Sequence, residues 1–137
     1  MRPPYRRLTA LIVDEDVGLL FWFGEIFATA GWNIVPALNC QQAVSLAAMW
    51  DLHIDLVVAN PALRGVSEMV ETLSRVHRPK VVVIHEPDMA AIPADATLDR
   101  PDIRTSKSRA DSAKLVRKLL RNIGLGFETE PDGSRGV

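Results

Sequence analysis

Acidic side chains cluster directly after the first apolar run of the chain. Asp14, Glu15 and Asp16 follow the apolar residues 8–13, and Asn60 follows a later apolar run. Carboxylate oxygens are the ligands that Mg²⁺ and Ca²⁺ prefer, and they can also act as nucleophiles or general acids. A carboxamide is a poor nucleophile and carries no charge. The pattern predicts a polar site at strand ends, with an amide at one of the positions.

Two further apolar runs, residues 80–85 and 96–98, also end in polar side chains. In an open parallel sheet with helices on both faces, the carboxyl ends of the strands lie at one edge, and ligands bind there. The polar residues of these runs should therefore lie near the three acids and Asn60. They are His85, Glu86, Asp99 and Arg100, followed by Pro101.

Strand-like and helix-like segments alternate along the chain, which predicts right-handed crossovers and a parallel sheet covered by helices on both faces. Apolar residues at helical spacing and capping residues mark the helices. The predicted strands span 8–13, 32–38, 54–59, 80–85 and 96–98. The predicted helices span 17–30 with Asp16 as N-cap, 40–50 capped by Asn39, 66–77 opened by Ser67, and 108–123 ended by Gly124.

Composition limits the class of protein. The 137 residues are 47% hydrophobic and 24% charged with a formal net charge of -1, which is typical of one globular domain. Cys40 is the single cysteine, so there is no intramolecular disulfide and no cysteine cluster for zinc. The apolar run near the N-terminus is too short for a signal peptide or a membrane span. We expect a cytoplasmic protein with one domain at residues 1–123 and a flexible tail at 124–137.

Over residues 8–123 the chain resembles a response-regulator receiver domain, the phosphorylatable module of two-component signalling. The stretches that carry the resemblance are "IVDED", "DLVVANPALRG", "VVVIHEP" and "LDRP". The resemblance implies an α/β, flavodoxin-like fold: a doubly wound, five-stranded parallel sheet (βα)5 with strand order 2-1-3-4-5. Pro87 and Pro93 break the segment before the fifth strand, which predicts a shortened fourth helix.

The resemblance also assigns roles to individual positions. Asp14 and Glu15 match the acidic pair that holds a divalent cation, so a weak Mg²⁺ site is the cofactor it implies, and no other cofactor is expected. Asn60 stands at the position of the phosphoacceptor Asp. The switch positions fall on His85 in place of a hydroxyl residue, Thr97 in place of an aromatic residue, and Arg100 in place of Lys, with Pro101 as a candidate for a cis peptide bond.

These substitutions predict a receiver domain without its phosphorylation switch. Acyl-phosphate formation needs a carboxylate nucleophile, which Asn60 lacks. The planar guanidinium of Arg100 can hold a carboxylate with two parallel hydrogen bonds, and this contact can fix the pocket in one state without phosphate. His85 can hydrogen-bond Asn60 or an acid. We therefore predict a stand-alone, atypical receiver that is not an enzyme and acts as a protein-interaction module.

The predicted first helix carries two adjacent aromatic residues, Phe21 and Trp22. With the apolar stripe facing the sheet, a step of 100° per residue turns Phe21 outward and leaves Trp22 at the edge of the stripe. We expect this exposed pair to be a partner surface. The resemblance implies a histidine kinase, a phosphotransfer protein or another receiver as partner, and a homodimer through this helix is an alternative.

Two other features of the sequence fit different functions. The spacing of Asp14 and Asp16 also fits a haloacid-dehalogenase-like phosphatase, with Asp14 as nucleophile and Asp16 as general acid. That fold needs a hydroxyl residue, a Lys and a further acidic pair, for which the next strand ends offer His85 and Glu86. The basic residues between 104 and 121 suggest an anionic partner, but no element that could read bases follows, and we do not expect nucleic-acid binding.

Overall fold

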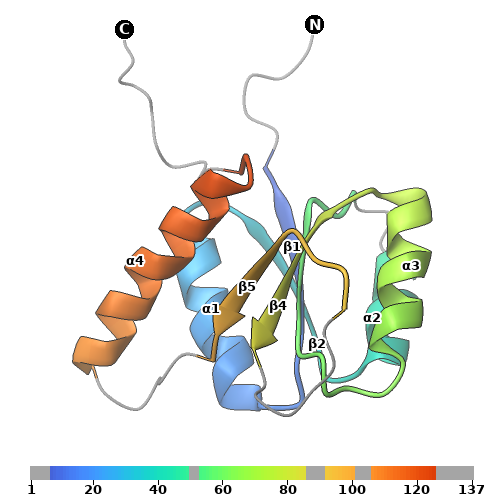
Figure 1. The fold of residues 1–137 in the computed structure, drawn as a ribbon, viewed down its shortest axis with the longest axis horizontal. Helices are drawn as coiled ribbons and strands as arrows, with labels where there is room; N and C mark the ends of the chain where they lie inside the picture. The colour runs from blue at the N-terminus through green and yellow to red at the C-terminus, as the bar shows by residue number, and fades with distance from the viewer. Residues whose placement is uncertain (1–6, 50–52, 86–91, 101–105, 126–137) are drawn as a thin grey trace, which may run out of the picture.

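The chain forms a single five-stranded parallel sheet in a computed structural model that describes residues 7–49, 53–85, 92–100 and 106–125 (Figure 1). The strand order is β2-β1-β3-β4-β5, as predicted, with all neighbouring strands parallel. The strands are β1 at Thr9–Val13, β2 at Asn33–Ala37, β3 at Leu56–Ala59, β4 at Lys80–His85 and β5 at Ala96–Asp99.

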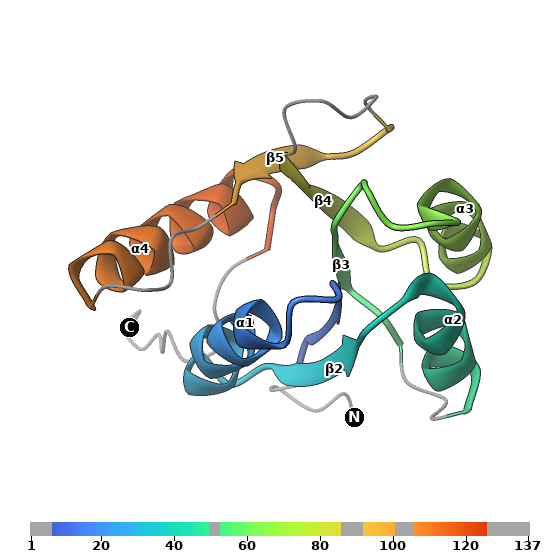
Figure 2. The same cartoon turned by 90° about the horizontal axis from the view of Figure 1, so that it is seen from below.

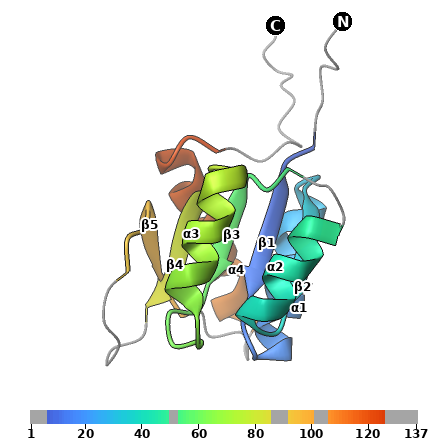
Figure 3. The same cartoon turned by 90° about the vertical axis from the view of Figure 1, so that its right-hand side faces the viewer.

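Four helices in the described part of the chain cover both faces of the sheet. Helices α1 and α4 lie on one face, and α2 and α3 lie side by side on the other (Figures 2 and 3). They are α1 at Val17–Thr29, α2 at Cys40–Met49, α3 at Val66–Val76 and α4 at Ser106–Asn122. Residues 92–95 of the connection between β4 and β5 are not helical, and residues 86–91 lie outside the described residues. None of the described helices is long and apolar enough to cross a membrane.

The sheet separates two apolar cores. Ile12 of β1 packs with Phe23 and Phe27 of α1 in the first, while Leu11 packs with Met69 of α3 in the second. Successive strand side chains point to opposite faces, and both faces are covered by helices. This arrangement is the reason that the strands read as continuous apolar runs rather than as alternating ones.

The helix starts show where local sequence decides an element's boundary. Asp16 caps α1 by accepting a hydrogen bond from the Leu19 N–H at 3.2 Å, as predicted. Asn39 caps α2 in the same way. The predicted opening of α3 at Ser67 is wrong, because the helix begins at Val66 after Gly65, whose φ of +80° is a left-handed conformation that glycine adopts without strain.

Helix α4 ends where the sequence predicts. Gly124 has a φ of +90°, and its N–H donates to the carbonyl of Arg121, which closes the last turn. The helix begins at Ser106, two residues before the predicted start. Its buried residues, Val116 and Leu120, join the core that α1 forms with the sheet. The predicted tail begins at this terminus, and residues 126–137 lie outside the described residues.

Candidate functional site

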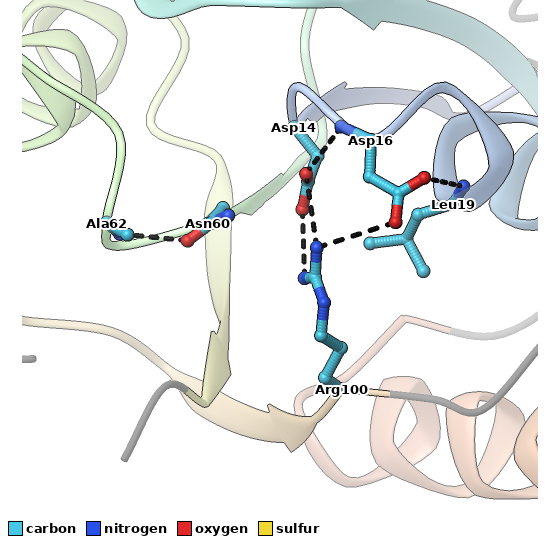
Figure 4. A network of polar contacts seen from close by, with 6 residues as sticks. All are labelled: Asp14, Asp16, Leu19, Asn60, Ala62 and Arg100. Atoms are coloured by element: carbon cyan, nitrogen blue, oxygen red, sulfur yellow. Dashed lines mark hydrogen bonds and ion pairs between the residues drawn. The ribbon is translucent and has the colours of Figure 1, made fainter. Parts of the chain in front are cut away.

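The carboxyl ends of β1, β3 and β5 bring the predicted site together. Val13 and Ala59 are register partners, so Asp14 and Asn60 leave adjacent strands at the same level. The Asn60 N–H donates to the Val13 carbonyl at 3.2 Å and extends this pairing by one bond. Arg100 comes from the end of β5 and reaches the same site (Figure 4).

Asp14 is fully buried, and its side chain is held from two directions. Its carboxylate accepts hydrogen bonds from Arg100 Nη1 at 3.2 Å and Nη2 at 3.4 Å. Oδ1 also accepts the Asp16 N–H at 2.9 Å, and the Asp14 N–H donates to Ala37 of β2 at 3.1 Å. A buried carboxylate is stable only when it is paired and hydrogen-bonded, and Arg100 provides that pairing with a planar fork.

Asp16 is the second acid beside Arg100. Its Oδ2 lies 3.8 Å from Arg100 Nη2, while its Oδ1 caps α1. The sequence had paired Glu15 with Asp14 in the acidic pocket; Glu15 and Asp16 are both exposed to solvent, and Asp16 is the one whose carboxylate is placed beside Arg100 here. Capping explains the difference, because the N-cap side chain must turn back toward the helix start, and this places Asp16 on the side of the pocket.

Asn60 has a structural role in the turn that follows β3. The residue is 5% exposed, and its Oδ1 accepts the Ala62 N–H at 2.8 Å (Figure 4). Its carbonyl accepts the Leu63 N–H at 3.1 Å. An Asn side chain that bonds its own backbone two residues ahead forms an Asx turn, which fixes the course of the chain. The amide oxygen is therefore engaged in holding residues 60–63.

The remaining switch positions do not join this network. His85 is exposed at the end of β4, and Thr97 is exposed as the second residue of β5. The sequence had suggested a hydrogen bond from His85 to Asn60 or to an acid. Among the described residues, no such bond is formed by the His85 ring. Pro101, the candidate for a cis peptide bond, lies outside the described residues. Arg100 is thus the switch position that the structure places in the pocket.

The predicted exposed aromatic pair on α1 is half wrong. Phe21 is 73% exposed, but Trp22 is only 3% exposed and packs edge-to-face on Phe23 with ring centroids 4.9 Å apart. Trp22 is one turn from both Leu19 and Ile26, so the buried face of α1 is wide enough to include it.

Phe21 lines an apolar groove of about 520 Å³ between α1 and the edge strand β2. Gly24 forms part of the wall, and a Cβ added there would have no heavy atom within 4 Å, so the groove is open above it. The remaining lining residues are Val17, Leu20, Glu25, Ala28, Ile34 and Pro36. Exposed apolar surface of this kind often marks a binding site.

A second polar cluster, which the sequence did not reveal, lies at the amino end of β3, where the chain also leaves α3. His77 Nδ1 accepts the Ile54 N–H at 3.1 Å, and the His53 and His77 rings are 5.7 Å apart. Burial, and then the nearby His53, lower the pKa of His77, against the opposing effect of Asp55. In the described part of the chain, no three His, Cys, Asp or Glu side chains are grouped to hold a metal ion.

Cys40 is a packing residue in this structure. It is buried at the start of α2, and burial followed by the charge of Glu68 raises the pKa of its thiol. A raised thiol pKa reduces the fraction of thiolate, which is the reactive form. Cys40 is therefore unlike a reactive cysteine, and in the described part of the chain the pocket is built from Asp14, Asp16, Arg100 and Asn60.

Comparison with known proteins identifies the fold. No family model and no curated protein matches the chain. Among solved structures it is similar to a CheY-like response regulator receiver domain from Methanospirillum hungatei, with 20% identity, a TM-score of 0.61, and coverage of 85% of this chain and 96% of that one. It is also similar to the signal receiver domain of an HD domain-containing protein from Pseudomonas fluorescens, with 16% identity, a TM-score of 0.66, and coverage of 90% of this chain and 93% of that one.

A third similar structure contains a partner. It is CheY6 of R. sphaeroides in complex with the P1 domain of CheA3, with 20% identity, a TM-score of 0.60, and coverage of 83% of this chain and 97% of that one. All three similarities span nearly the whole length of the compared chains. The fold of this chain is therefore that of CheY-like receiver domains.

Proposed function

We propose that this chain is an atypical receiver-like domain of two-component phosphorelay signalling that acts by binding other proteins without phosphorylation of Asn60. It has no catalytic activity of its own, and it works in the cytoplasm. The receiver fold supports the signalling context. The proposal on phosphorylation depends on the chemistry of the pocket.

The observation that carries the proposal is the state of the two side chains at the ends of β1 and β3. At the acceptor position, Asn60 offers an amide whose oxygen already holds the Ala62 N–H. The nearby carboxylate, Asp14, is buried and bound by Arg100 on both oxygens. A nucleophile must be free to approach phosphorus, and neither group is. The same contacts disfavour a phosphatase that uses Asp14 as its nucleophile, because both of its oxygens are bound by Arg100.

The proposed partner is a histidine kinase, a phosphotransfer protein or another receiver. The complex of CheY6 with a CheA3 P1 domain supports a partner of this class for a chain of this fold. The apolar groove beside Phe21 is the proposed contact surface, since Phe21 is the large aromatic side chain exposed on α1. Aromatic side chains are enriched at the energetic centres of protein interfaces.

The experiment for phosphorylation is intact-mass measurement after incubation with acetyl phosphate and Mg²⁺. The wild type and Asp14→Asn should show no adduct. Asn60→Asp tests whether a carboxylate at this position is sufficient, and either result with this variant is compatible with the proposal. An adduct of one phosphoryl group on the wild type that is lost in Asp14→Asn would contradict it, because the switch would then operate at Asp14.

The experiment for the partner is capture on the immobilised protein, with and without acetyl phosphate. We expect a protein of the two-component class to bind the wild type equally well in both conditions. The Phe21→Ser variant should no longer capture it. Val76→Ser is the matched control, because Val76 is equally exposed but lies on α3. Binding that requires acetyl phosphate, or that survives Phe21→Ser, would reject the proposed mode of action. Light scattering on the same variants tests the alternative of a homodimer through α1.

A further inference from the structure

The pocket already contains a cation, supplied by the chain itself. The Arg100 guanidinium lies between the carboxylates of Asp14 and Asp16, with nitrogen–oxygen distances of 3.2 and 3.4 Å to the first and 3.8 Å to the second (Figure 4). We infer that this guanidinium takes the place of the divalent cation that the receiver fold implies, so that the pocket does not bind Mg²⁺. The inference rests on the proposed function and deepens it: the pocket that is not phosphorylated would also not respond to Mg²⁺.

Distances favour a guanidinium over a metal ion. Mg²⁺ requires oxygen ligands at about 2.0–2.1 Å in a nearly octahedral arrangement. The carboxylate oxygens of Asp14 and Asp16 are instead spaced around nitrogens more than 3 Å away. A metal at their centre would have to displace the Arg100 guanidinium, which is held against the fully buried carboxylate of Asp14.

The oxygen atoms are also committed to other donors. Asp14 Oδ1 accepts the Asp16 N–H, and Asp16 Oδ1 caps α1. The third ligand that the fold would offer a metal is the residue at the acceptor position, and Asn60 uses its side-chain oxygen for the Ala62 N–H. Mg²⁺ would therefore compete with these donors for the Oδ1 atoms and would have to displace Arg100 from the Oδ2 atoms of both acids.

Charge leads to the same conclusion. Two carboxylates and one guanidinium leave a single net negative charge in the pocket, because Asn60 contributes none. Mg²⁺ is strongly hydrated and usually keeps several waters, so its binding depends on the charge of the few carboxylates that it contacts, and here the guanidinium already offsets half of that charge. When an uncharged residue replaces Arg100, the negative charge of the two carboxylates is no longer offset, and they can attract a cation. The expected Mg²⁺ affinity of such a variant is weak, on the order of millimolar, because few protein oxygens are available.

The test compares Mg²⁺ binding by the wild type and by Arg100→Gln. Isothermal titration with MgCl₂, and thermal unfolding in MgCl₂ against NaCl of equal ionic strength, should show no specific effect on the wild type at about 10 mM. A ligand that binds only the native state raises the unfolding temperature, so Arg100→Gln should unfold at a higher temperature in MgCl₂ than in NaCl. Its apparent affinity should exceed that of the wild type by at least about tenfold.

Two controls make the result specific. Arg75→Gln removes an exposed arginine paired with Glu71 on α3, so it should remain as insensitive to Mg²⁺ as the wild type. The double variant Arg100→Gln with Asp16→Asn should lose the gained response, because one of the two carboxylates is gone.

Two outcomes would overturn the inference. The first is specific Mg²⁺ binding by the wild type, which can be measured even if Arg100→Gln does not fold. The second is an Arg100→Gln variant that is folded by circular dichroism but shows neither Mg²⁺ binding nor a higher unfolding temperature in MgCl₂. Both differ from the result that would overturn the proposed function, a phosphoryl adduct on the wild type, so failure of either idea can be recognised separately.

Discussion

At the scale of single residues, Phe21 and Trp22 are adjacent on α1 and have opposite environments. Phe21 lies at the surface beside the groove, whereas Trp22 is enclosed by the core that contains Phe23. Stability depends on apolar area removed from water, and binding depends on apolar area left exposed. The two rings should therefore control different properties of the protein.

Truncation of each ring tests this division. Trp22→Ala should lower the free energy of unfolding by about 3–5 kcal/mol, as expected for loss of a buried aromatic side chain. Phe21→Ala should change it by less than about 0.5 kcal/mol, as expected for a surface position. Urea unfolding followed by far-ultraviolet circular dichroism measures both. Equal losses would mean that Phe21 is also a core residue and that the groove is closed in solution.

His77 should make the stability of the protein depend on pH. Burial, and then the nearby His53, lower its pKa below the ordinary value of 6.5, so the native state resists protonation more than the unfolded chain does. Below about pH 6.5 the unfolded chain then binds more protons, and the contribution of His77 to stability is lost as the pH falls through its lower native pKa. Protonation at Nδ1 would also remove the acceptor for the Ile54 N–H.

The comparison for this effect is His77→Asn, measured by urea unfolding between pH 7.5 and 5. The Asn oxygen can accept the same hydrogen bond but does not titrate near neutral pH. We expect the difference in stability between wild type and variant to change as the pH falls, with the wild type losing more. A constant difference across this range would show that His77 does not contribute to the pH dependence.

At the scale of elements, Asp16 both caps α1 and lies beside Arg100. The cap is a direct hydrogen bond to Leu19, whereas the ion pair is long and its two side chains are 49% and 35% exposed. Exposed ion pairs contribute little, while loss of an N-cap costs about 0.5–2 kcal/mol. The cap should be the larger contribution to stability.

Two substitutions separate these contributions. Asp16→Ala should destabilise the protein by about 1 kcal/mol, and Asp16→Asn by less than about 0.5 kcal/mol, because Asn is an equally good N-cap without charge. Asn39→Ala, which removes the corresponding cap of α2, should resemble Asp16→Ala. Thermal unfolding of the three variants gives the order. A loss in Asp16→Asn as large as that in Asp16→Ala would assign the main contribution to the contact with Arg100.

Elements were predictable from the sequence where one local signal determines them. Apolar runs located all five strands, and side-chain caps located the starts of α1 and α2. The residue that opens α3 was predicted wrongly, because Gly65 opens the helix through its backbone conformation and Ser67 does not cap it. Positions in the pocket were predicted less well, since the direction of Asp16 relative to Glu15 depends on how the turn after β1 is closed.

The buried state of Trp22 was not predictable for a related reason. A helical stripe shows which side of a helix is apolar, but its width depends on what packs against it. Here α4 and the sheet both contribute to the core around α1, including Val116 and Leu120 of α4. The His77 cluster was equally hidden, because the residues that form it come from the end of α3 and the start of β3. Such contacts exist only after the elements have assembled.

At the scale of the whole molecule, one sheet serves two cores. Ile12 and Leu11 are neighbours on β1, yet each belongs to a different core. Loss of packing on one face must therefore disturb strands that the other face needs. Trp22 and Trp32 both lie in the core shared by α1 and α4, so in a Trp50→Phe background, which removes the third tryptophan of the chain, fluorescence reports mainly on one side of the sheet.

This shared sheet predicts a single cooperative unfolding transition. Met69→Ala, in the core beneath α3, should lower stability by about 2–5 kcal/mol, and Phe27→Ala, in the core beneath α1, by about 3–5 kcal/mol. In both variants, tryptophan fluorescence and circular dichroism should give the same urea midpoint, because small single domains usually unfold in one step. If Met69→Ala lowered the midpoint by circular dichroism but not by fluorescence, the core around α1 would be stable on its own, and the two layers would be separate folding units.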